Sequence, residues 1–374
     1  MDFSLNKEQR DLFLLVKCAL WNDGQTACDV CDVDWGEVYT LAKEQCLIGI
    51  VADSFRWLDK GQCDGGERLK WLAYVVRLER KNREMDGLVD RLFDKFRRMG
   101  LSPVLMKGQA FAANYPFPLH RQCGDIDVYF KQRTDCGKAI AWASKVDKDS
   151  AVSLDNKRER KHFSFSIGGN VVELHHFMCL FENDRLHQRL QRIIDREFAV
   201  SQVFCVEIGG KPIETVPPTL SVLHQVIHIA RHLMEAGIGL RQLCDLAVYL
   251  DKYHDKIDRE RLKGYLDKLE LTTVAEALGY ILTEYIGLGK EKLPFGRNGK
   301  YAKFVLQEIF EGGNFGKKKV TYRETRHHWL RKLQSIVFFY KRCKIYRPLF
   351  PSEAKSYFWN KIRLNANLLA KHHY

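Results

Sequence analysis

Residues 105–130 read LMKGQAFAANYPFPLHRQCGDIDVYF, and this stretch decides the fold that the sequence predicts. The apolar run at 103–106 (PVLM) and the alternating polar and apolar residues at 125–130 (DIDVYF) each predict a strand. Between them, residues 109–115 (QAFAANY) predict a short helix. Two strands joined through a glycine turn and a helix indicate a small α/β unit.

Three acids in this unit are expected to form a metal site. Asp125 and Asp127 stand two residues apart on the second strand, so both side chains point to one face. The third acid, Glu173, lies in a strand predicted at 171–175, which a glycine-rich hairpin turn joins to another strand at 162–167. Carboxylates on one face repel each other unless cations lie between them, and magnesium accepts carboxylate and phosphate oxygens together. If the strands are neighbours, the three acids converge and hold two ions.

A set of basic and polar residues beside the acids is expected to bind phosphates. Lys107, Gly108 and Gln109 form the turn after the first strand, where glycine permits close backbone approach and a helix N-terminus favours an anion. Arg121 stands four residues before Asp125 and is expected to add a positive charge to the same pocket.

Each of four further polar residues fits two different roles. His175 faces the same way as the third acid, so it either contacts a substrate or orients a carboxylate. His228 and His232 are four apart on a predicted helix, a spacing that suits helix packing, with substrate contact as the alternative. Arg241 is either a substrate contact or the partner of Asp245, also four residues away.

Hydrophobic periodicity outside this unit is helical, before residue 100 and again after Pro217. The fold class is therefore expected to be α+β, a small mixed sheet with helices, flanked by N-terminal and C-terminal helical regions. We expect a helical region at 1–100, an α/β core at 101–210, a helical domain at 211–316 and a basic aromatic helical tail at 317–374.

The net charge of +13 is concentrated in the tail. Residues 317–374 contain fifteen Lys or Arg against two acids, so 15 − 2 = +13, and the rest of the chain is nearly neutral. Cations interleaved with aromatic rings suit nucleic acid. Rings at helical spacing are also typical of a hydrophobic core. The cations are then expected on a solvated face or at an anionic membrane surface.

The cysteine and hydropathy patterns indicate a cytoplasmic protein. Eleven cysteines at irregular spacing cannot all pair within one chain, and free thiols are typical of a reducing compartment. No apolar run approaches the roughly 20 residues that cross a bilayer, so no transmembrane segment is expected.

These motifs together resemble the polymerase-β nucleotidyltransferase superfamily. Within it, L-x-K-G, R-x-x-G-D-I-D and V-E-L-H are similar to a largely uncharacterised bacterial nucleotidyltransferase family, and H-x-x-x-H followed by R-x-L-x-D-L at 228–246 resembles its helical part. The resemblance covers residues 101–250. It implies an enzyme that moves a nucleoside monophosphate from a Mg²⁺-bound nucleoside triphosphate, with ATP expected, to a hydroxyl acceptor and releases pyrophosphate. A protein side chain, an RNA end and a sugar-like molecule are all open as acceptors.

One departure from the superfamily keeps two other functions open. Most members carry Gly-Ser or Gly-Gly at the turn where this chain has Lys107, Gly108 and Gln109. The usual serine contact to the phosphates is missing, and Lys107 or Gln109 would have to replace it. A catalytically weak binding or regulatory module, similar to an antitoxin, is therefore one alternative. A basic helical protein that binds nucleic acid is the other.

Overall fold

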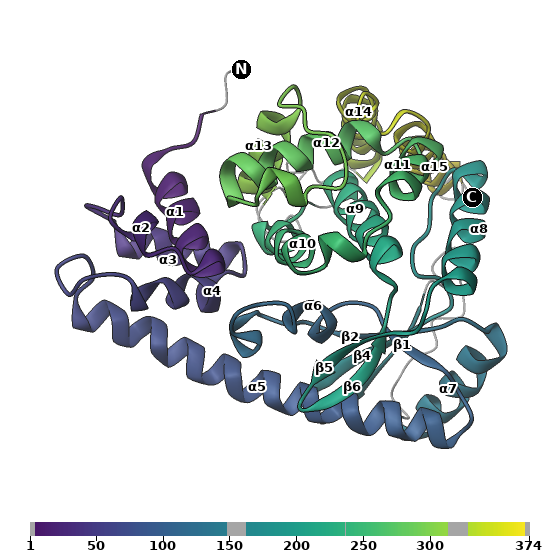
Figure 1. Cartoon of the computed structure of the whole chain (residues 1–374). Helices are drawn as coiled ribbons and strands as arrows, with labels where there is room; N and C mark the ends of the chain where they lie inside the picture. Colours follow the sequence, from purple (N-terminus) through teal and green to yellow (C-terminus); the bar gives the residue numbers. More distant parts are fainter. Residues whose placement is uncertain (1–3, 148–161, 236, 313–327, 371–374) are drawn as a thin grey trace.

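The computed structural model describes residues 4–147, 162–235, 237–312 and 328–370. The fold is α+β, as the sequence predicts, with one six-stranded mixed sheet and helices before and after it (Figure 1). The N-terminal helices are α1 (Lys7–Trp21), α2 (Gly24–Ala27), α3 (Trp35–Glu44), α4 (Ile48–Ala52), the 3₁₀ turn η1 (Asp53–Arg56) and α5 (Gly65–Arg98).

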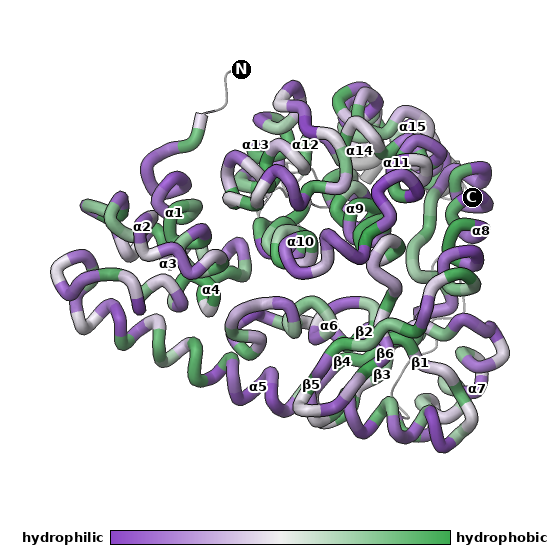
Figure 2. Tube along the Cα trace, viewed as in Figure 1, coloured by the Kyte–Doolittle hydropathy of each residue, from purple (hydrophilic) through white to green (hydrophobic). Residues whose placement is uncertain are grey.

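The longest helix, α5, has a defined signal at each end. Its first turn is capped by Asp64, whose carboxylate accepts the backbone N–H groups of Gly66 at 2.7 Å and Glu67 at 3.0 Å. It ends at Arg98, and Gly100 two residues later adopts a left-handed φ of 72°, as expected of a glycine after a helix. Figure 2 shows hydrophilic and hydrophobic segments alternating along α5, and its apolar side packs beneath the sheet.

The sheet contains the four expected strands and two more. The expected strands are β1 (Pro103–Leu105), β2 (Ile126–Phe130), β3 (His162–Ile167) and β4 (Asn170–His175), and the additional ones are β5 (Phe204–Ile208) and β6 (Lys211–Thr215). Their order is β3-β4-β2-β1-β6-β5, with β2 parallel to β4 and β1 parallel to β6. The turn from β5 to β6 is Gly209-Gly210, with φ of 57° and 78°, a hairpin signal that the sequence did contain.

The remaining helices pack beside the sheet and form a bundle. Those of the α/β layer are α6 (Gln109–Ala112), η2 (Pro118–His120), α7 (Arg133–Val146) and α8 (Asp184–Val200). Those of the bundle are α9 (Pro218–Glu235), α10 (Leu240–Tyr253), η3 (His254–Lys256), α11 (Arg259–Lys268), α12 (Thr272–Ile281), the π-helical η4 (Leu282–Ile286), η5 (Lys290–Lys292), α13 (Ala302–Gly312), α14 (His328–Tyr346) and α15 (Pro351–Ala370). The expected boundary between residues 316 and 317 lies outside the described residues.

Strand alternation gives the sheet one apolar face and one face that carries the acids. Ile126, Val128 and Phe130 of β2 belong to a core that includes side chains of α5 and α7. Asp127 and Tyr129 point the other way, toward the helical bundle. Tyr129 joins the larger core that contains the bundle helices.

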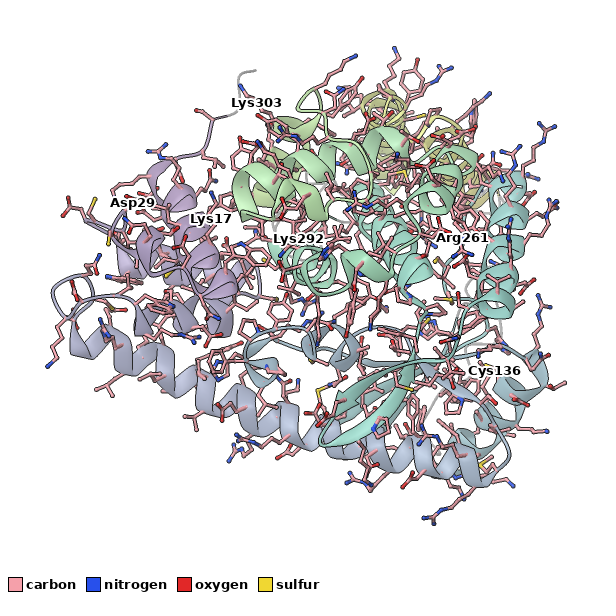
Figure 3. The ribbon with its side chains drawn as sticks, in the orientation of Figure 1. Lys17, Asp29, Cys136, Arg261, Lys292 and Lys303 are labelled. Atoms are coloured by element: carbon pink, nitrogen blue, oxygen red, sulfur yellow. The ribbon has the colours of Figure 1, made fainter. Side chains whose placement is uncertain are left out.

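The N-terminal helices pack against the bundle as well as against α5. The indole Nε1 of Trp21 donates to the carbonyl of Ile286 at 2.7 Å, and Lys17, labelled in Figure 3, donates to the carbonyl of Glu284 at 3.3 Å. The ring of Phe13 also lies edge-on to the ring of Phe310 in α13. One apolar cluster therefore extends from α1 through the bundle.

Phe96 tests the packing of α5 beneath the sheet. Its side chain is fully buried, with ring centroids 5.3 Å from Phe130 and 5.4 Å from Trp142. We expect Phe96→Ala to lower the unfolding free energy by about 3–5 kcal/mol, because it leaves a cavity. Urea unfolding followed by circular dichroism measures this. Val76→Ala on the same helix, where the side chain is 66% exposed, is the control and is expected to change stability by less than about 0.5 kcal/mol.

Candidate active site

The register of two parallel strands brings the predicted acids together. Pairing of β2 with β4 places Asp127 opposite Glu173 and Tyr129 opposite His175. Asp125, immediately before β2, lines the same cavity of about 510 Å³ as Asp127 and Glu173. The three carboxylates therefore share one pocket, between the sheet and helices α9 and α10.

Asp127 is ionised although it is buried. The Nζ of Lys107 and the Nε2 of His175 each lie 2.9 Å from its Oδ1, and the residue is 5% exposed. Burial raises the pKa of this carboxyl, but the Lys107 ammonium and the His175 imidazole outweigh burial and hold the pKa well below its usual range. His175 thus takes the carboxylate-orienting position, and Lys107 contacts an acid of the site.

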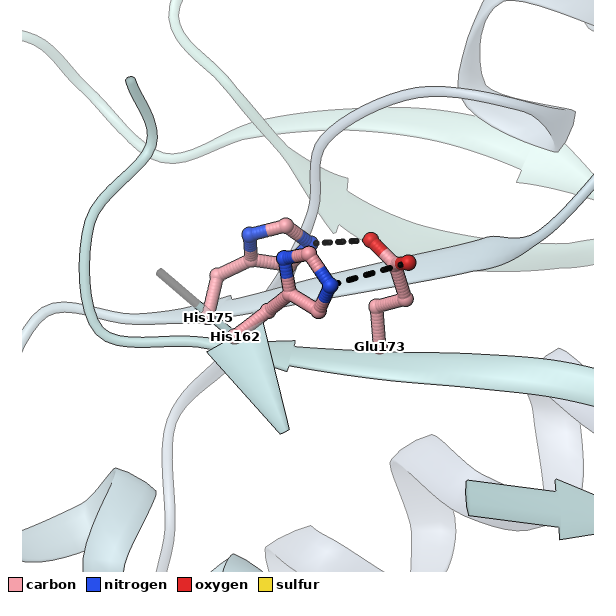
Figure 4. Close-up of side chains that lie close together, drawn as sticks. All are labelled: His162, Glu173 and His175. Carbon is pink, nitrogen blue, oxygen red and sulfur yellow. Dashed lines mark ion pairs between the residues drawn. The ribbon is translucent and has the colours of Figure 1, made fainter. Parts of the chain in front are cut away.

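A second histidine completes a cluster around Glu173. His162 Nε2 lies 3.2 Å from Oε1 of Glu173, and His175 Nε2 lies 3.3 Å from Oε2 (Figure 4). One ligand atom from each of these three residues lies within 4.8 Å of the others, a spacing that can hold a metal ion. Burial is the largest influence on the pKa of Glu173 and raises it, but the hydrogen bond from His175 and the charges of His162 and His175 together lower the pKa overall.

His162 was missed from the sequence although a signal was present. Strands β3 and β4 form a hairpin around Gly168 and Gly169, with His162 directly opposite His175. Counting back from that turn would have placed His162 on the same face as Glu173.

The donor set fits a divalent cation. Burial raises the pKa of Asp125, and the negative charges of Glu173 and Asp127 raise it further, so these carboxylates are not fully neutralised by the cations near them. Carboxylate oxygens suit magnesium and manganese, whereas the imidazoles of His162 and His175 extend the range to metals such as zinc and iron.

The turn before α6 requires glycine, but the helix that follows the turn is short. Gly108 has a left-handed φ of 64°, and a Cβ there would lie 3.1 Å from the carbonyl oxygen of Asp125. Helix α6 contains four residues, fewer than the sequence predicted. Gln109 is 2% exposed, and neither polar atom of its side chain has a hydrogen-bond partner within the described residues. The phosphate-binding roles of Gly108 and Gln109 remain predictions.

Arg121 lines the cavity, as the sequence predicts, but its guanidinium is paired with a carboxylate of α10. Its guanidinium forms a bidentate pair with Asp245, with Nη2 at 2.6 Å and Nε at 3.0 Å from the two carboxylate oxygens. The hydroxyl of Tyr115 donates to the same carboxylate at 2.8 Å. Asp245 therefore pairs with Arg121, and the Arg241–Asp245 bridge considered from the sequence is not the pair formed. The pair ties the segment before β2 to α10.

Helix α10 contributes a buried cation, Arg241, that forms no ion pair with a carboxylate in the part of the chain that the structure describes. Arg241 is 9% exposed and lines the cavity, where its Nη1 donates to the carbonyl of Gln122 at 2.7 Å. Its Nε has no hydrogen-bond partner among the residues described. Burial and the neighbouring Arg121 lower the pKa of Arg241.

Helix α9 lines the opposite wall of the cavity with polar side chains. His224, His228 and His232 occupy successive turns and all border the cavity, with the rings of His228 and His232 4.3 Å apart. Gln225 of α9 and Gln242 of α10 border it too, and both are buried. The amide of Gln225 and the Oε1 of Gln242 lack hydrogen-bond partners in the described parts of the chain. Neither glutamine was identified from the sequence, because glutamine in a helix carries no distinctive spacing.

The mixed sheet, the D-x-D strand beside a glutamate strand and the helical bundle over the acids define a nucleotidyltransferase class of protein. Residues 32–287 match the model of a family described as uncharacterised nucleotidyltransferase, so the chain belongs to that family and the resemblance seen in the sequence is confirmed.

Other comparisons add less. A crystal structure of an antigenic nucleotidyltransferase-like protein from Paracoccidioides brasiliensis is similar, at 12% identity and a TM-score of 0.34, over 59% of this chain and 96% of that chain. Comparison with curated proteins gives no match. Among the described residues, no helix combines the length and apolar character needed to cross a bilayer.

Lys107→Met tests the buried ion pair of the site. We expect it to lower the unfolding free energy at pH 7 by about 3–5 kcal/mol, because the Asp127 carboxylate loses its cation. Lys107→Arg keeps the charge and is the control, with a smaller loss expected. Urea unfolding measures both variants.

The pH dependence of the same variant gives an independent check. The pKa of Asp127 is lower in the folded protein than in the unfolded chain, where it is about 3.9. The Asp127 carboxylate therefore stabilises the fold fully above the pKa of the unfolded chain. This stabilisation is lost as the pH falls from the unfolded-state pKa toward the folded-state pKa. The stability gap between wild type and Lys107→Met is expected to narrow from about pH 5 to about pH 3. A gap that is constant over this interval would contradict the assignment.

Proposed function

We propose that this protein transfers a nucleoside monophosphate from a Mg²⁺-bound nucleoside triphosphate, with ATP the first to test, to a hydroxyl acceptor and releases pyrophosphate. The observation that carries the proposal is the parallel register that sets Asp127 beside Glu173 in a cavity shared with Asp125. Membership of a nucleotidyltransferase family supports the same reaction class.

In this proposal Asp125, Asp127 and Glu173 hold two Mg²⁺ ions. The cations held by these carboxylates would supply charge neutralisation at the phosphates and activation of the attacking hydroxyl. His175 holds both Asp127 and Glu173 in place through its Nε2. His162 limits the rotation of Glu173 from the other side. Positioning and electrostatic stabilisation would therefore supply most of the rate enhancement.

The helical wall supplies the substrate contacts in this proposal. Arg241 carries a buried positive charge toward the cavity, and an anionic phosphate would neutralise it. Gln225 and Gln242 offer amide groups to a polar ligand, and His228 and His232 border the same space. The acceptor itself stays open among a protein side chain, an RNA end and a sugar-like molecule.

A second candidate function has one observation in its favour. The Lys107 ammonium lies against Asp127, where it competes with a metal ion for the carboxylate. A protein that binds nucleotide with slow turnover, as in a regulatory or antitoxin-like module, would tolerate this competition. Nucleotide binding without pyrophosphate release, for every common triphosphate and in the presence of cell extract as a source of acceptors, would favour this second function.

Location and domain organisation are part of the proposal. All eleven cysteines are free thiols, which supports a reducing, cytoplasmic location. We propose the segments 1–100, 101–210, 211–316 and 317–374, although β6 at the start of the third segment belongs to the sheet of the second. The second and third segments supply most of the cavity lining.

Asp125→Asn tests the catalytic assignment. Asp125 is the acid whose charge its neighbours disfavour most, so this change removes a proposed metal ligand while relieving repulsion in the free protein. We expect pyrophosphate release from Mg²⁺-ATP to fall by about a hundredfold or more, with a thermal unfolding midpoint that is unchanged or higher. Glu207→Gln, an exposed carboxylate on β5, is the control and is expected to keep full activity. Equal turnover in both variants would remove Asp125 from the mechanism.

Arg241→Met separates binding from folding. Because burial disfavours the charge of Arg241, its removal is expected to leave the unfolding midpoint unchanged or raise it. The affinity for Mg²⁺-ATP, measured calorimetrically without acceptor, is expected to fall by about tenfold or more. Arg192→Met on the exposed side of α8 is the matched control. Unaltered ATP affinity in Arg241→Met would show that Arg241 does not contact the triphosphate.

A further inference from the structure

The hairpin of α14 and α15 exposes apolar side chains beside an excess of positive charge. Residues 328–370 contain nine Lys or Arg and a single acid, Glu353. Sixteen large apolar side chains are exposed across the described residues, and seven of them lie on these two helices: Leu333, Val337, Phe338, Tyr340, Ile345, Trp359 and Leu364. This concentration on two helices sets the hairpin apart from the remaining surface.

The opposite face of the hairpin is fixed to the bundle. Tyr346 is fully buried and its hydroxyl bonds to Glu308 of α13, which also pairs with Arg342 at 3.4 Å. Glu353 is buried and its carboxylate accepts the backbone N–H of Glu182 at 2.7 Å. The only acid of the hairpin therefore points inward, and the charges on its exposed surface are all positive.

Most aromatic residues of the hairpin are either buried or exposed, and Phe339 is half-buried against the core. Tyr346, Phe350, Tyr357 and Phe358 are buried and form the contact with the bundle, as the core reading of the sequence expects. Phe338, Tyr340 and Trp359 are 41%, 54% and 60% exposed. The side chain of Trp329 lies outside the described residues.

The exposed residues follow the helix period. Leu333, Val337, Tyr340 and Lys344 stand at i, i+4, i+7 and i+11 of α14, so they form one stripe along the helix. Lys341 is exposed beside this stripe. The second helix, α15, carries a similar stripe, with Lys355, Trp359 and Arg363 at intervals of four. The two helices lie side by side at the top of the molecule (Figure 1).

We propose that the α14–α15 hairpin binds the surface of an anionic lipid bilayer. Apolar side chains would enter the boundary between headgroups and acyl chains, while the long stems of Lys341 and Lys344 keep their ammonium groups at the anionic headgroups. Trp359 and Tyr340 have the amphipathic rings that are enriched at this interface. The protein would lie on the membrane through this face.

Aliphatic side chains favour a membrane over a nucleic acid. Single-stranded nucleic acids bind to aromatic rings on which bases stack, together with cations at the phosphates. Leu333, Val337, Ile345 and Leu364 offer neither interaction, and each is at least 45% exposed. Pairing with a second copy of the same face would bring like charges together, which opposes association.

Vesicle flotation with the full chain tests the proposal. We expect binding to vesicles that mix phosphatidylglycerol with phosphatidylcholine, and much weaker binding to phosphatidylcholine alone. The double variant Leu333→Ser, Val337→Ser is expected to lower the partition coefficient by about tenfold or more. The matched control is Leu69→Ser, Val76→Ser on α5, where the side chains are 69% and 66% exposed, and it is expected to bind like wild type.

A second variant changes the charge of the hairpin and leaves its exposed apolar side chains unchanged. Lys341→Glu, Lys344→Glu is expected to reduce binding by a similar factor and to make it less sensitive to salt. Equal thermal midpoints for all variants verify folding. No binding of wild type to the anionic vesicles would overturn the proposal. So would a Leu333→Ser, Val337→Ser variant that binds vesicles normally, or a single-stranded RNA oligonucleotide that binds this face while vesicles do not.

Discussion

Parallel pairing of β2 with β4 is the contact on which the site depends. The alternate residues of both strands, such as Val128 and Leu174, are buried against α5 and α7, and this apolar core fixes the register. A slip of one residue would turn the buried set toward the cavity and the acids into the core. The free energy of apolar burial therefore holds Asp127 and Glu173 side by side in spite of their charges.

The charges of the cavity are only partly balanced within the protein. Lys107 and His175 offset Asp127, while the pKa of Asp125 is raised by burial and by the acids beside it. Across the cavity, Arg241 is buried, and no carboxylate of the described residues forms an ion pair with it. A ligand that presents cations to the acids and an anion to Arg241 relieves both costs, and a metal-bound triphosphate has this charge distribution. The unbalanced charges lower the stability of the free protein and strengthen its binding of such a ligand.

The helical bundle serves two surfaces through the same helices. Helix α9 lines the cavity with His228 and His232, and its backbone carbonyl at Leu233 accepts a hydrogen bond from Arg342 of α14 at 3.1 Å. The hairpin with the exposed basic and apolar stripe is thus attached directly to a wall of the candidate active site. In the proposed arrangement, a membrane-bound protein would hold its cavity at a defined position relative to the lipid surface.

The sequence by itself determined the features that depend on local periodicity: the D-x-D strand, the phase of Glu173, the end of α5 and the helical character of the C-terminal half. The β5–β6 hairpin carried a glycine signal that the sequence analysis missed. Only the tertiary structure decided how the charges pair, because partner choice depends on distance in space. Arg121 pairs with Asp245 across 124 residues, and Lys107, just after the end of β1, reaches Asp127 on the neighbouring strand β2. No short-range pattern encodes such contacts, since each requires the sheet and the bundle to be packed together first.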